Sequence, residues 1–204
     1  MDECTVVEEF LDGASICRTR ILITSGRADP PQRAGSVNDG YELQRTDAKG
    51  EGVFATRSFQ LGETVMVGVI DRELDENHSH ASQIDEKRFV LHGGLVPKVN
   101  HSCEPNCGIH LNASGAHDLI ARWSITAGQE ITFDYAMRNY SVSHFAAHCR
   151  CGTPCCRDRI TGWKGLPAER KADYRGFVAP YLIEIDHQLA GTSTDLTGKG
   201  SELP

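Results

Sequence analysis

The 204-residue sequence has no long apolar run. No stretch approaches the roughly 18 consecutive apolar residues of a membrane-spanning helix. The first ten residues, MDECTVVEEF, lack the basic region followed by an apolar one that marks a secretory signal. We therefore expect an intracellular protein with no membrane partner, cytoplasmic if bacterial and nuclear or cytoplasmic if eukaryotic.

An excess of positive charge is missing as well. The chain carries 21 Lys and Arg against 28 Asp and Glu, a formal net charge of −7. Proteins that bind the phosphate backbone need clustered basic residues, so we expect no direct nucleic-acid partner. A basic protein or segment suits this charge better, although the same charge also suits simple solubility.

Helical periodicity is scarce, whereas turn residues are frequent, with 20 Gly and 8 Pro. Short β-like runs occur in YELQ, GVFATRSF, ETVMVGVI, DLIARWSI and EITFDY, separated by glycine turns. Helix formers gather after Pro167, where Gly176 and Pro180 interrupt them. The pattern predicts an α+β fold that is predominantly β, with a C-terminal helical appendage.

Half of the eight cysteines lie within CRCGTPCC, and without an export signal this favours a metal site over disulfides. Cys149, Cys151 and Cys156 can supply three thiolates from one loop. Cys155 is adjacent to Cys156 and cannot easily point at the same ion, so a fourth ligand must come from elsewhere, and Cys103 is the best candidate. Four thiolates would make a closed structural zinc site. Free thiols or a disulfide are the alternative.

A glycine pair precedes one of the predicted strands. Gly50 and Gly52 flank Glu51 and leave room for the backbone to approach a ligand closely. By itself the pair also suits an ordinary β-turn. A third glycine is absent and a strand follows rather than a helix, which argues against a dinucleotide-binding fingerprint.

Four segments in this order, KGEGVFA, VNHSCEPN, GQEITFDY and CRCGTPCCR, resemble the SET-domain family of protein methyltransferases with a post-SET zinc motif, in its compact stand-alone form. The resemblance covers about Tyr41 to Trp163. It implies small curved β-sheets around a pseudoknot, in which the NHSC segment is crossed by the chain near the last tyrosine. The expected segments are an N-terminal extension or linker (1–40), the SET domain (41–140), a post-SET zinc-binding region (141–166), the helical appendage (167–190) and a flexible tail (191–204).

The resemblance also implies roles for single residues. Tyr135 matches the catalytic tyrosine that orients the substrate amine, and Cys103 matches the fourth zinc ligand. Phe133 matches a position that controls how many methyl groups are added, and a phenylalanine there implies multiple methylation, unless it only fills the core. The implied S-adenosylmethionine site consists of Gly50, Glu51, Gly52, Val53, Asn100, His101 and Trp163. Packing against the C-terminal helix is the alternative role of Trp163.

The implied function is transfer of methyl groups from S-adenosylmethionine to a lysine of a protein substrate, with zinc as a structural ion. Methylation of histidine or another nucleophile is one alternative, and a catalytically silent SET module that binds a protein is another. The chain lacks a cysteine-dense pre-SET cluster, and its 71–97 insert, the region that shapes specificity in the family, is unusual. We expect the insert's histidines, His78, His80 and His92, to be surface or loop residues.

Overall fold

The structure is a computed structural model that describes residues 40–145 and 148–195, and their side chains as far as residue 190. The predicted N-terminal extension, except its last residue, and residues 196–204 lie outside this part. The strands are β1 (Tyr41–Thr46), β2 (Gly50–Ala55), β3 (Thr64–Met66), β4 (Ile70–Leu74), β5 (Ala81–Asp85), β6 (Arg88–His92), β7 (Asn100–His101), β8 (Cys107–Leu111), β9 (His117–Ala121) and β10 (Glu130–Phe133). The 3-10 helices are η1 (Val96–Lys98), η2 (Tyr135–Met137) and η3 (Trp163–Gly165), and the α-helices are α1 (Ala168–Asp173) and α2 (Pro180–Asp195).

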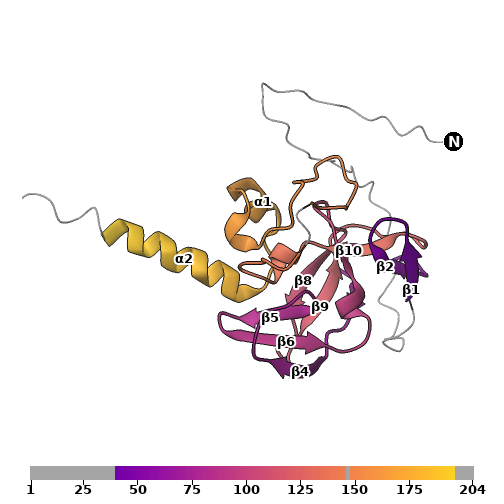
Figure 1. Cartoon of the computed structure of the whole chain (residues 1–204), viewed down its shortest axis with the longest axis horizontal. Coiled ribbons are helices and arrows are strands. Elements are labelled where there is room, and N and C mark those ends of the chain that lie inside the picture. The colour runs from indigo at the N-terminus through magenta and orange to yellow at the C-terminus, as the bar shows by residue number, and fades with distance from the viewer. Residues whose placement is uncertain (1–39, 146–147, 196–204) are drawn as a thin grey trace, which may run out of the picture. The chain divides into compact units, whose positions relative to one another are not determined.

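The strands form three small sheets, with the orders β1-β2-β10-β7, β3-β9-β8 and β4-β6-β5 (Figure 1). The fold is therefore α+β and predominantly β, as the sequence predicts. Apolar positions of the strands build the core between the sheets: Val53 of β2 faces Ile131 of β10 in the register, and both are fully buried. Burying such side chains stabilises the fold by about 1.5–3 kcal/mol each.

The turn between β8 and β9 shows how local sequence sets the topology. Asn112 Oδ1 accepts hydrogen bonds from the backbone N–H groups of Ser114 and Ala116, at 3.0 and 3.1 Å. Gly115 takes a positive φ of 81°, which a residue without a Cβ adopts at little cost. The chain reverses here, and β9 can then pair with both β8 and β3.

The insert is an ordered three-stranded sheet of β4, β6 and β5. His92 on β6 is 2% exposed, so the expectation that it is a surface or loop residue is wrong. Its Nδ1 lies 2.8 Å from Ser82 Oγ, and its Nε2 accepts a hydrogen bond of 3.1 Å from the backbone N–H of His117. The imidazole is tolerated in the core because both of its nitrogens are hydrogen-bonded.

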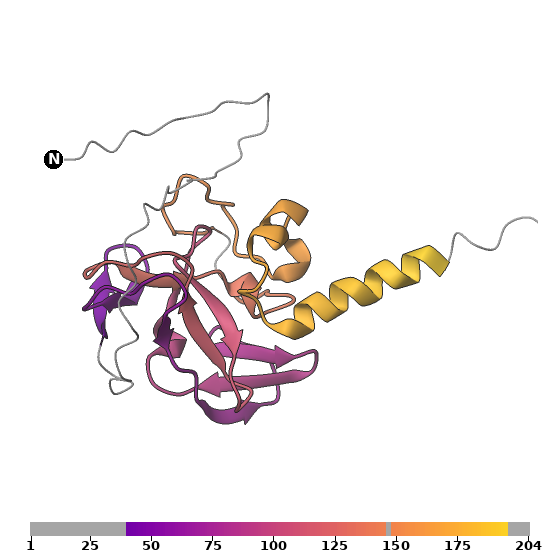
Figure 2. The ribbon, with the colours of Figure 1, turned by 180° about the vertical axis from the view of Figure 1, so that it is seen from behind.

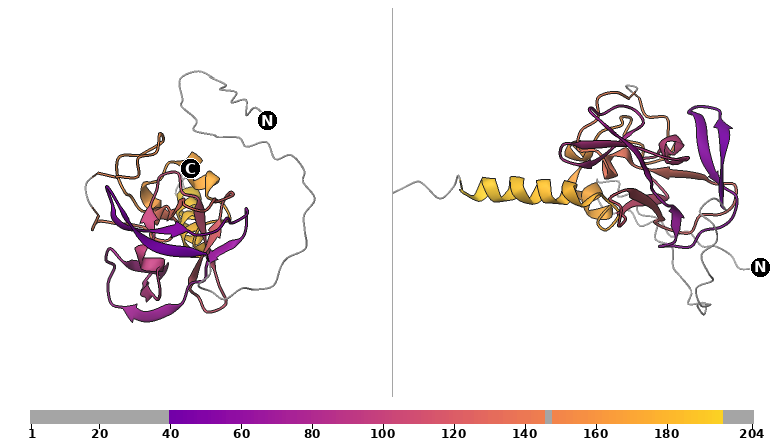
Figure 3. Two further views of the ribbon diagram at one scale, coloured as in Figure 1. Left: turned by 90° about the vertical axis from the view of Figure 1, so that its right-hand side faces the viewer. Right: turned by 90° about the horizontal axis from the view of Figure 1, so that it is seen from below.

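The C-terminal segment forms two helices, separated where the sequence predicts a break. Gly176 has a φ of 85°, and Pro180 begins α2, a position where its missing N–H costs nothing. The first turn of α2 is anchored by buried Tyr181, whose hydroxyl donates to the carbonyl oxygen of Arg138 at 2.9 Å. The rest of α2 extends away from the sheets (Figure 2), at the end opposite the β1–β2 hairpin (Figure 3). The helix runs to Asp195, five residues past the predicted end of the appendage at 190.

None of the helices within the described residues is long and apolar enough to span a membrane.

Candidate active site

Strand β10 brings three distant segments of the sequence together. It pairs with β2 in antiparallel fashion and with β7 in parallel, where Thr132 faces Asn100 and Phe133 faces His101. The turn after β7 returns to the same strand, because the Asn106 side chain accepts from Thr132 N and donates to Glu130 O, each at 2.8 Å. Asn106 therefore holds this turn against β10 rather than only capping it.

A cavity of about 190 Å³ lies where these segments meet. It is lined by Lys49, Glu51, Ser79, His80, Pro97, Lys98, Asn100, Tyr135 and Phe145. Three of the predicted site residues, Glu51, Asn100 and Tyr135, therefore share one cavity. Small-molecule sites usually measure about 300–1,000 Å³, so this cavity would enclose only part of a cofactor.

The polar side of the cavity is built around the Asn100 amide. Asn100 Nδ2 donates to Glu51 O and to Glu130 Oε1, each at 2.8 Å. A Cβ on Gly52 would lie 2.8 Å from Asn100 Nδ2 and 2.6 Å from Glu130 Oε1, so a larger residue here would have to displace the ends of these two side chains.

Two lysines complete this side of the cavity. Lys98 forms an ion pair with Glu51 at 2.9 Å and holds the pKa of that carboxyl below its usual value, and Lys49 forms an ion pair with Glu130. Ammonium, carboxylate and amide groups within one small site suit a ligand that carries both an amine and a carboxylate. The residues present therefore fit the amino-acid part of S-adenosylmethionine.

Tyr135 forms the aromatic side of the cavity. Its hydroxyl donates to Val99 O at 3.2 Å, and its ring centroid lies 5.1 Å from that of Phe133 and 4.7 Å from that of Phe145. Burial raises the pKa of the phenol above its ordinary value. The hydroxyl therefore stays protonated near neutral pH and can orient a substrate.

Several predicted residues do not line this cavity. Val53 and Phe133 are fully buried in the core. His101 is 4% exposed; its Nδ1 accepts from Tyr135 N at 3.3 Å and its Nε2 lies 3.4 Å from Cys103 Sγ. Burial lowers the pKa of His101 to about 4, so the ring is neutral and positions the backbone of Tyr135.

Trp163 also lies outside the cavity. It is 1% exposed, and its Nε1 donates to Asp186 Oδ2 on α2 at 2.8 Å. These contacts match the alternative role, packing against the C-terminal helix. Gly50 lies on the surface with a φ of 82° and shapes the turn before β2.

The predicted metal ligands lie together. The Sγ atoms of Cys103, Cys149, Cys151 and Cys156 are all within 4.8 Å of one another, and those of Cys103 and Cys149 are 3.9 Å apart. Zn–S bonds of about 2.3 Å in tetrahedral geometry place sulfur atoms about 3.8 Å apart, so this donor set fits zinc. Backbone N–H groups of the loop donate to two of the sulfurs, Cys103 and Cys156, each at 3.4 Å. A closed site of four thiolates has no open position, so its role would be structural.

The sequence interpretation missed an ion pair next to both sites. Asp134 is fully buried; its Oδ2 lies 2.6 Å from Arg157 Nη1 and accepts a 2.8 Å hydrogen bond from the Tyr174 hydroxyl. Burial alone would lower the pKa of the Arg157 guanidinium, but the Asp134 carboxylate outweighs burial and raises it. The sequence held one indication of this pair: Asp134 directly precedes the predicted site residue Tyr135, and Arg157 directly follows the predicted metal ligand Cys156.

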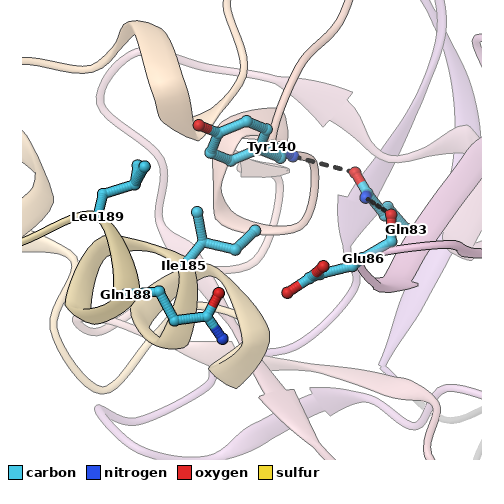
Figure 4. A pocket seen from close by; sticks show the side chains of 6 residues that line it. All are labelled: Gln83, Glu86, Tyr140, Ile185, Gln188 and Leu189. Atoms are coloured by element: carbon cyan, nitrogen blue, oxygen red, sulfur yellow. Dashed lines mark hydrogen bonds between the residues drawn. The ribbon is translucent and has the colours of Figure 1, made fainter. Parts of the chain in front are cut away.

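A second cavity, of about 410 Å³, lies between α2 and the β5–β6 turn (Figure 4). It is lined by Gln83, Glu86, Tyr140, Ile185, Gln188 and Leu189. Tyr140 N donates to Gln83 Oε1 at 3.1 Å and so fixes the wall next to β5. None of the predicted catalytic, cofactor or metal residues lines this cavity.

Comparison with known protein families finds a match to the central part of the chain. The family model described as SET domain matches residues 50–136, which span the glycine pair, the Asn100 turn and Tyr135. Residues 50–136 of this chain therefore match a SET domain.

Its relatives are much longer. The histone-lysine N-methyltransferase ash1 of Drosophila melanogaster is 33% identical over 156 residues, which cover 65% of this chain and 7% of ash1. The histone-lysine N-methyltransferase trr of the same organism is 29% identical over 134 residues, 56% of this chain and 6% of trr. An H3 lysine-36 specific enzyme of Schizosaccharomyces pombe is 35% identical over 82 residues, 39% of this chain and 10% of that protein. KRYPTONITE, in a crystal structure in complex with mCHG DNA and SAH, is 30% identical to this chain in sequence. The match covers 59% of this chain and 28% of the KRYPTONITE chain, with a TM-score of 0.48.

Proposed function

We propose that this chain transfers methyl groups from S-adenosylmethionine to a lysine side chain of a protein. The observation that carries the proposal is that one cavity contains the Asn100 amide, Glu51 of the glycine turn and the Tyr135 hydroxyl. A cofactor group and a reacting amine can meet there. The relatives named as histone-lysine N-methyltransferases support the same activity.

The chemistry requires a neutral amine, because a lysine ammonium, with an ordinary pKa of about 10.4, has no lone pair to donate. When bound, the cofactor would supply a sulfonium methyl group whose carbon the neutral amine nitrogen can attack, with the thioether as the leaving group. Tyr135 and the carbonyl oxygen of Val99 would orient the amine for this displacement. Alignment of this kind contributes up to roughly 7–11 kcal/mol in well-oriented model reactions.

The cofactor's amino and carboxylate groups would be held by the polar side of the cavity, at Glu51, Asn100, Lys49 and Lys98. We further propose that residues 41–140 are the SET domain and that 141–166 are its post-SET region. Zinc bound there would fix the loop and take no part in methyl transfer.

The proposed partner is a protein with an exposed lysine in a basic segment. The net charge of −7 supports this, as does the run DRELDE at the start of the insert, which places acidic side chains on and beside β4. We propose an intracellular location, because thiolates that bind zinc persist where cysteines stay reduced. The expectation that nucleic acid is not a direct partner stays a prediction.

The test is transfer of labelled methyl groups from S-adenosylmethionine to the proteins of a cell lysate, with mass spectrometry of the labelled residues. Tyr135→Phe should lower the rate of methyl transfer about 100-fold, the loss typical of a misplaced reactant. Its affinity for S-adenosylmethionine, measured by calorimetry, should stay unchanged. Tyr140→Phe is the matched control, because this tyrosine lines the other cavity and should keep full activity. Label on histidine, or no transfer by folded, zinc-loaded protein, would contradict the proposal.

A further inference from the structure

A buried arginine without a counter-charge lies behind the aromatic side of the cavity. Arg138 follows η2 and is only 3% exposed. Its guanidinium carbon lies 4.7 Å from the ring centroid of Phe133 and 5.6 Å from that of Tyr135. Among the side chains that the structure describes, within residues 40–145 and 148–190, no carboxylate forms an ion pair with Arg138, and its Nε has no hydrogen-bond partner.

The groups packed around Arg138 offer it no negative charge. His92 and His117, from β6 and β9, are stacked with their centroids 5.6 Å apart, and burial, together with Arg138, lowers the pKa of both, that of His92 to about 4. Both imidazoles are therefore neutral at neutral pH. Tyr181 from α2 is buried and keeps its proton, because burial raises its pKa.

The charge of Arg138 is felt in the cavity. Burial is the main cause of the lowered pKa of His80, which lines the cavity, and of nearby His144, and the Arg138 charge acts on both in the same direction. It also acts to lower the pKa of Tyr135, although burial outweighs this. The titratable and charged groups that face Arg138 or the cavity are Lys49, Glu51, His80, His92, Lys98, His117, Glu130, Tyr135, His144, Cys149 and Tyr181. The acidic members of this set are already paired, because Glu51 and Glu130 bind Lys98 and Lys49.

We propose that Arg138 is a positioning residue whose fixed positive charge keeps the target amine of the substrate neutral in the cavity. This rests on the proposed methyltransferase function. A second full charge close to a buried cation is unfavourable, so the lysine ammonium loses its proton to solvent as it enters. In the transition state the single positive charge is shared between nitrogen and sulfur, so the repulsion there is weaker than for the ammonium.

The experiment is the pH dependence of kcat, which reports groups in the enzyme–substrate complex. The full zinc-loaded chain is assayed at saturating S-adenosylmethionine, with the lysate protein that the wild type labels as acceptor. Arg138→Met should move the acidic limb about one unit to higher pH, the size expected for one charge several ångströms away at an effective dielectric constant of about 20. At pH values above the acidic limb, the kcat of the variant should equal that of the wild type.

Tyr181→Phe is the matched control. It removes the hydrogen bond to the Arg138 carbonyl oxygen but leaves the guanidinium charge, so its acidic limb should stay where the wild type has it. If Arg138→Met does not fold, Arg138→Gln tests the same loss of charge. For the wild type itself, the acidic limb must lie below the pKa of about 10.4 of free lysine.

An unchanged acidic limb in either neutral variant, an equal loss of rate at every pH, or a wild-type limb near pH 10.4 would overturn the proposal. The absence of methyl transfer by the wild type would instead overturn the proposed function. The two failures are therefore distinguishable.

Discussion

Asp134 and Arg157 form a buried ion pair, 2.6 Å from Oδ2 to Nη1, that connects the end of β10 to the zinc loop. Asp134 directly precedes Tyr135, and Arg157 directly follows Cys156. The Asp134 side chain is fully buried and that of Arg157 is 16% exposed, so water screens their attraction little. The position of Tyr135 is therefore coupled to the order of the zinc loop.

Asp134→Asn should lower the free energy of unfolding by about 3–5 kcal/mol, the cost of leaving a buried charge without its partner. Replacing Arg157 with Met in addition should recover part of this loss, because no unpaired charge then remains. Glu73→Gln breaks an exposed ion pair with Arg88 and should lower the free energy of unfolding far less, because water screens this pair. Urea unfolding measures all of these; equal small effects for Asp134→Asn and Glu73→Gln would contradict the coupling.

Purified protein should contain one zinc ion per chain, bound by the four clustered thiolates. Cys156→Ser should lose most of this zinc, because a serine hydroxyl replaces one of the four thiolates. Cys155→Ser, next to it but outside the cluster, should retain it. Metal analysis of both variants decides the assignment, which fails if their zinc contents are reversed.

The features that the sequence predicted best are those whose geometry is determined within one short segment. The glycine pair, the Asn100 turn and the cysteine spacing each define a local geometry, and the order of strands and turns gave the fold class. The sheet of the insert was not predicted, because polar residues such as Ser82 and Gln83 occupy buried positions on β5, where patterning expects apolar ones.

The pairing of Asp134 with Arg157 and the burial of Arg138 could not be predicted for a different reason. No local pattern relates residues that meet only after the zinc loop folds back on β10. An arginine is expected at the surface. Arg138 is buried because two aromatic rings, Phe133 and Tyr135, face its guanidinium.

Asn100→Ala should weaken binding of S-adenosylmethionine about tenfold, equivalent to the loss of roughly 1.4 kcal/mol of hydrogen bonding. The amide holds the Glu51 carbonyl at the edge of the cavity, so its removal loosens the turn that the cofactor would contact. Calorimetry with S-adenosylmethionine measures the affinity, and a thermal melt checks that the variant is folded. A folded variant with unchanged affinity would remove Asn100 from the site.

Acid should destabilise the protein through His92. Its pKa is about 4 in the folded state, mainly because of burial, against about 6.5 when unfolded, so between these values the unfolded chain binds the additional proton. The free energy of unfolding should therefore fall as pH falls from 6.5 to 4, by about 1.4 kcal/mol per unit for this group. His92→Gln should flatten the slope, whereas His110→Gln, a change at an exposed histidine, should not. Equal slopes for the wild type and His92→Gln, from urea unfolding across this range, would exclude the effect.

The number of methyl groups transferred should depend on Phe133. The centroid of its ring lies 5.1 Å from that of Tyr135, and the Arg138 guanidinium carbon lies 4.7 Å from the Phe133 centroid. The position therefore lies directly behind Tyr135. A phenylalanine offers no hydrogen-bond partner to a methylated amine, which can then turn and react again. A tyrosine hydroxyl introduced here would bind the amine or a water molecule and hold it after the first transfer. Intact-mass spectrometry of the substrate should therefore show di- or trimethyl product for the wild type and mainly monomethyl product for Phe133→Tyr.

Ala136→Ser, a small buried change in η2, controls for disturbed packing and should leave the product distribution unchanged. Monomethyl product alone from the wild type would show that Phe133 does not permit repeated transfer, and that the channel is narrowed elsewhere.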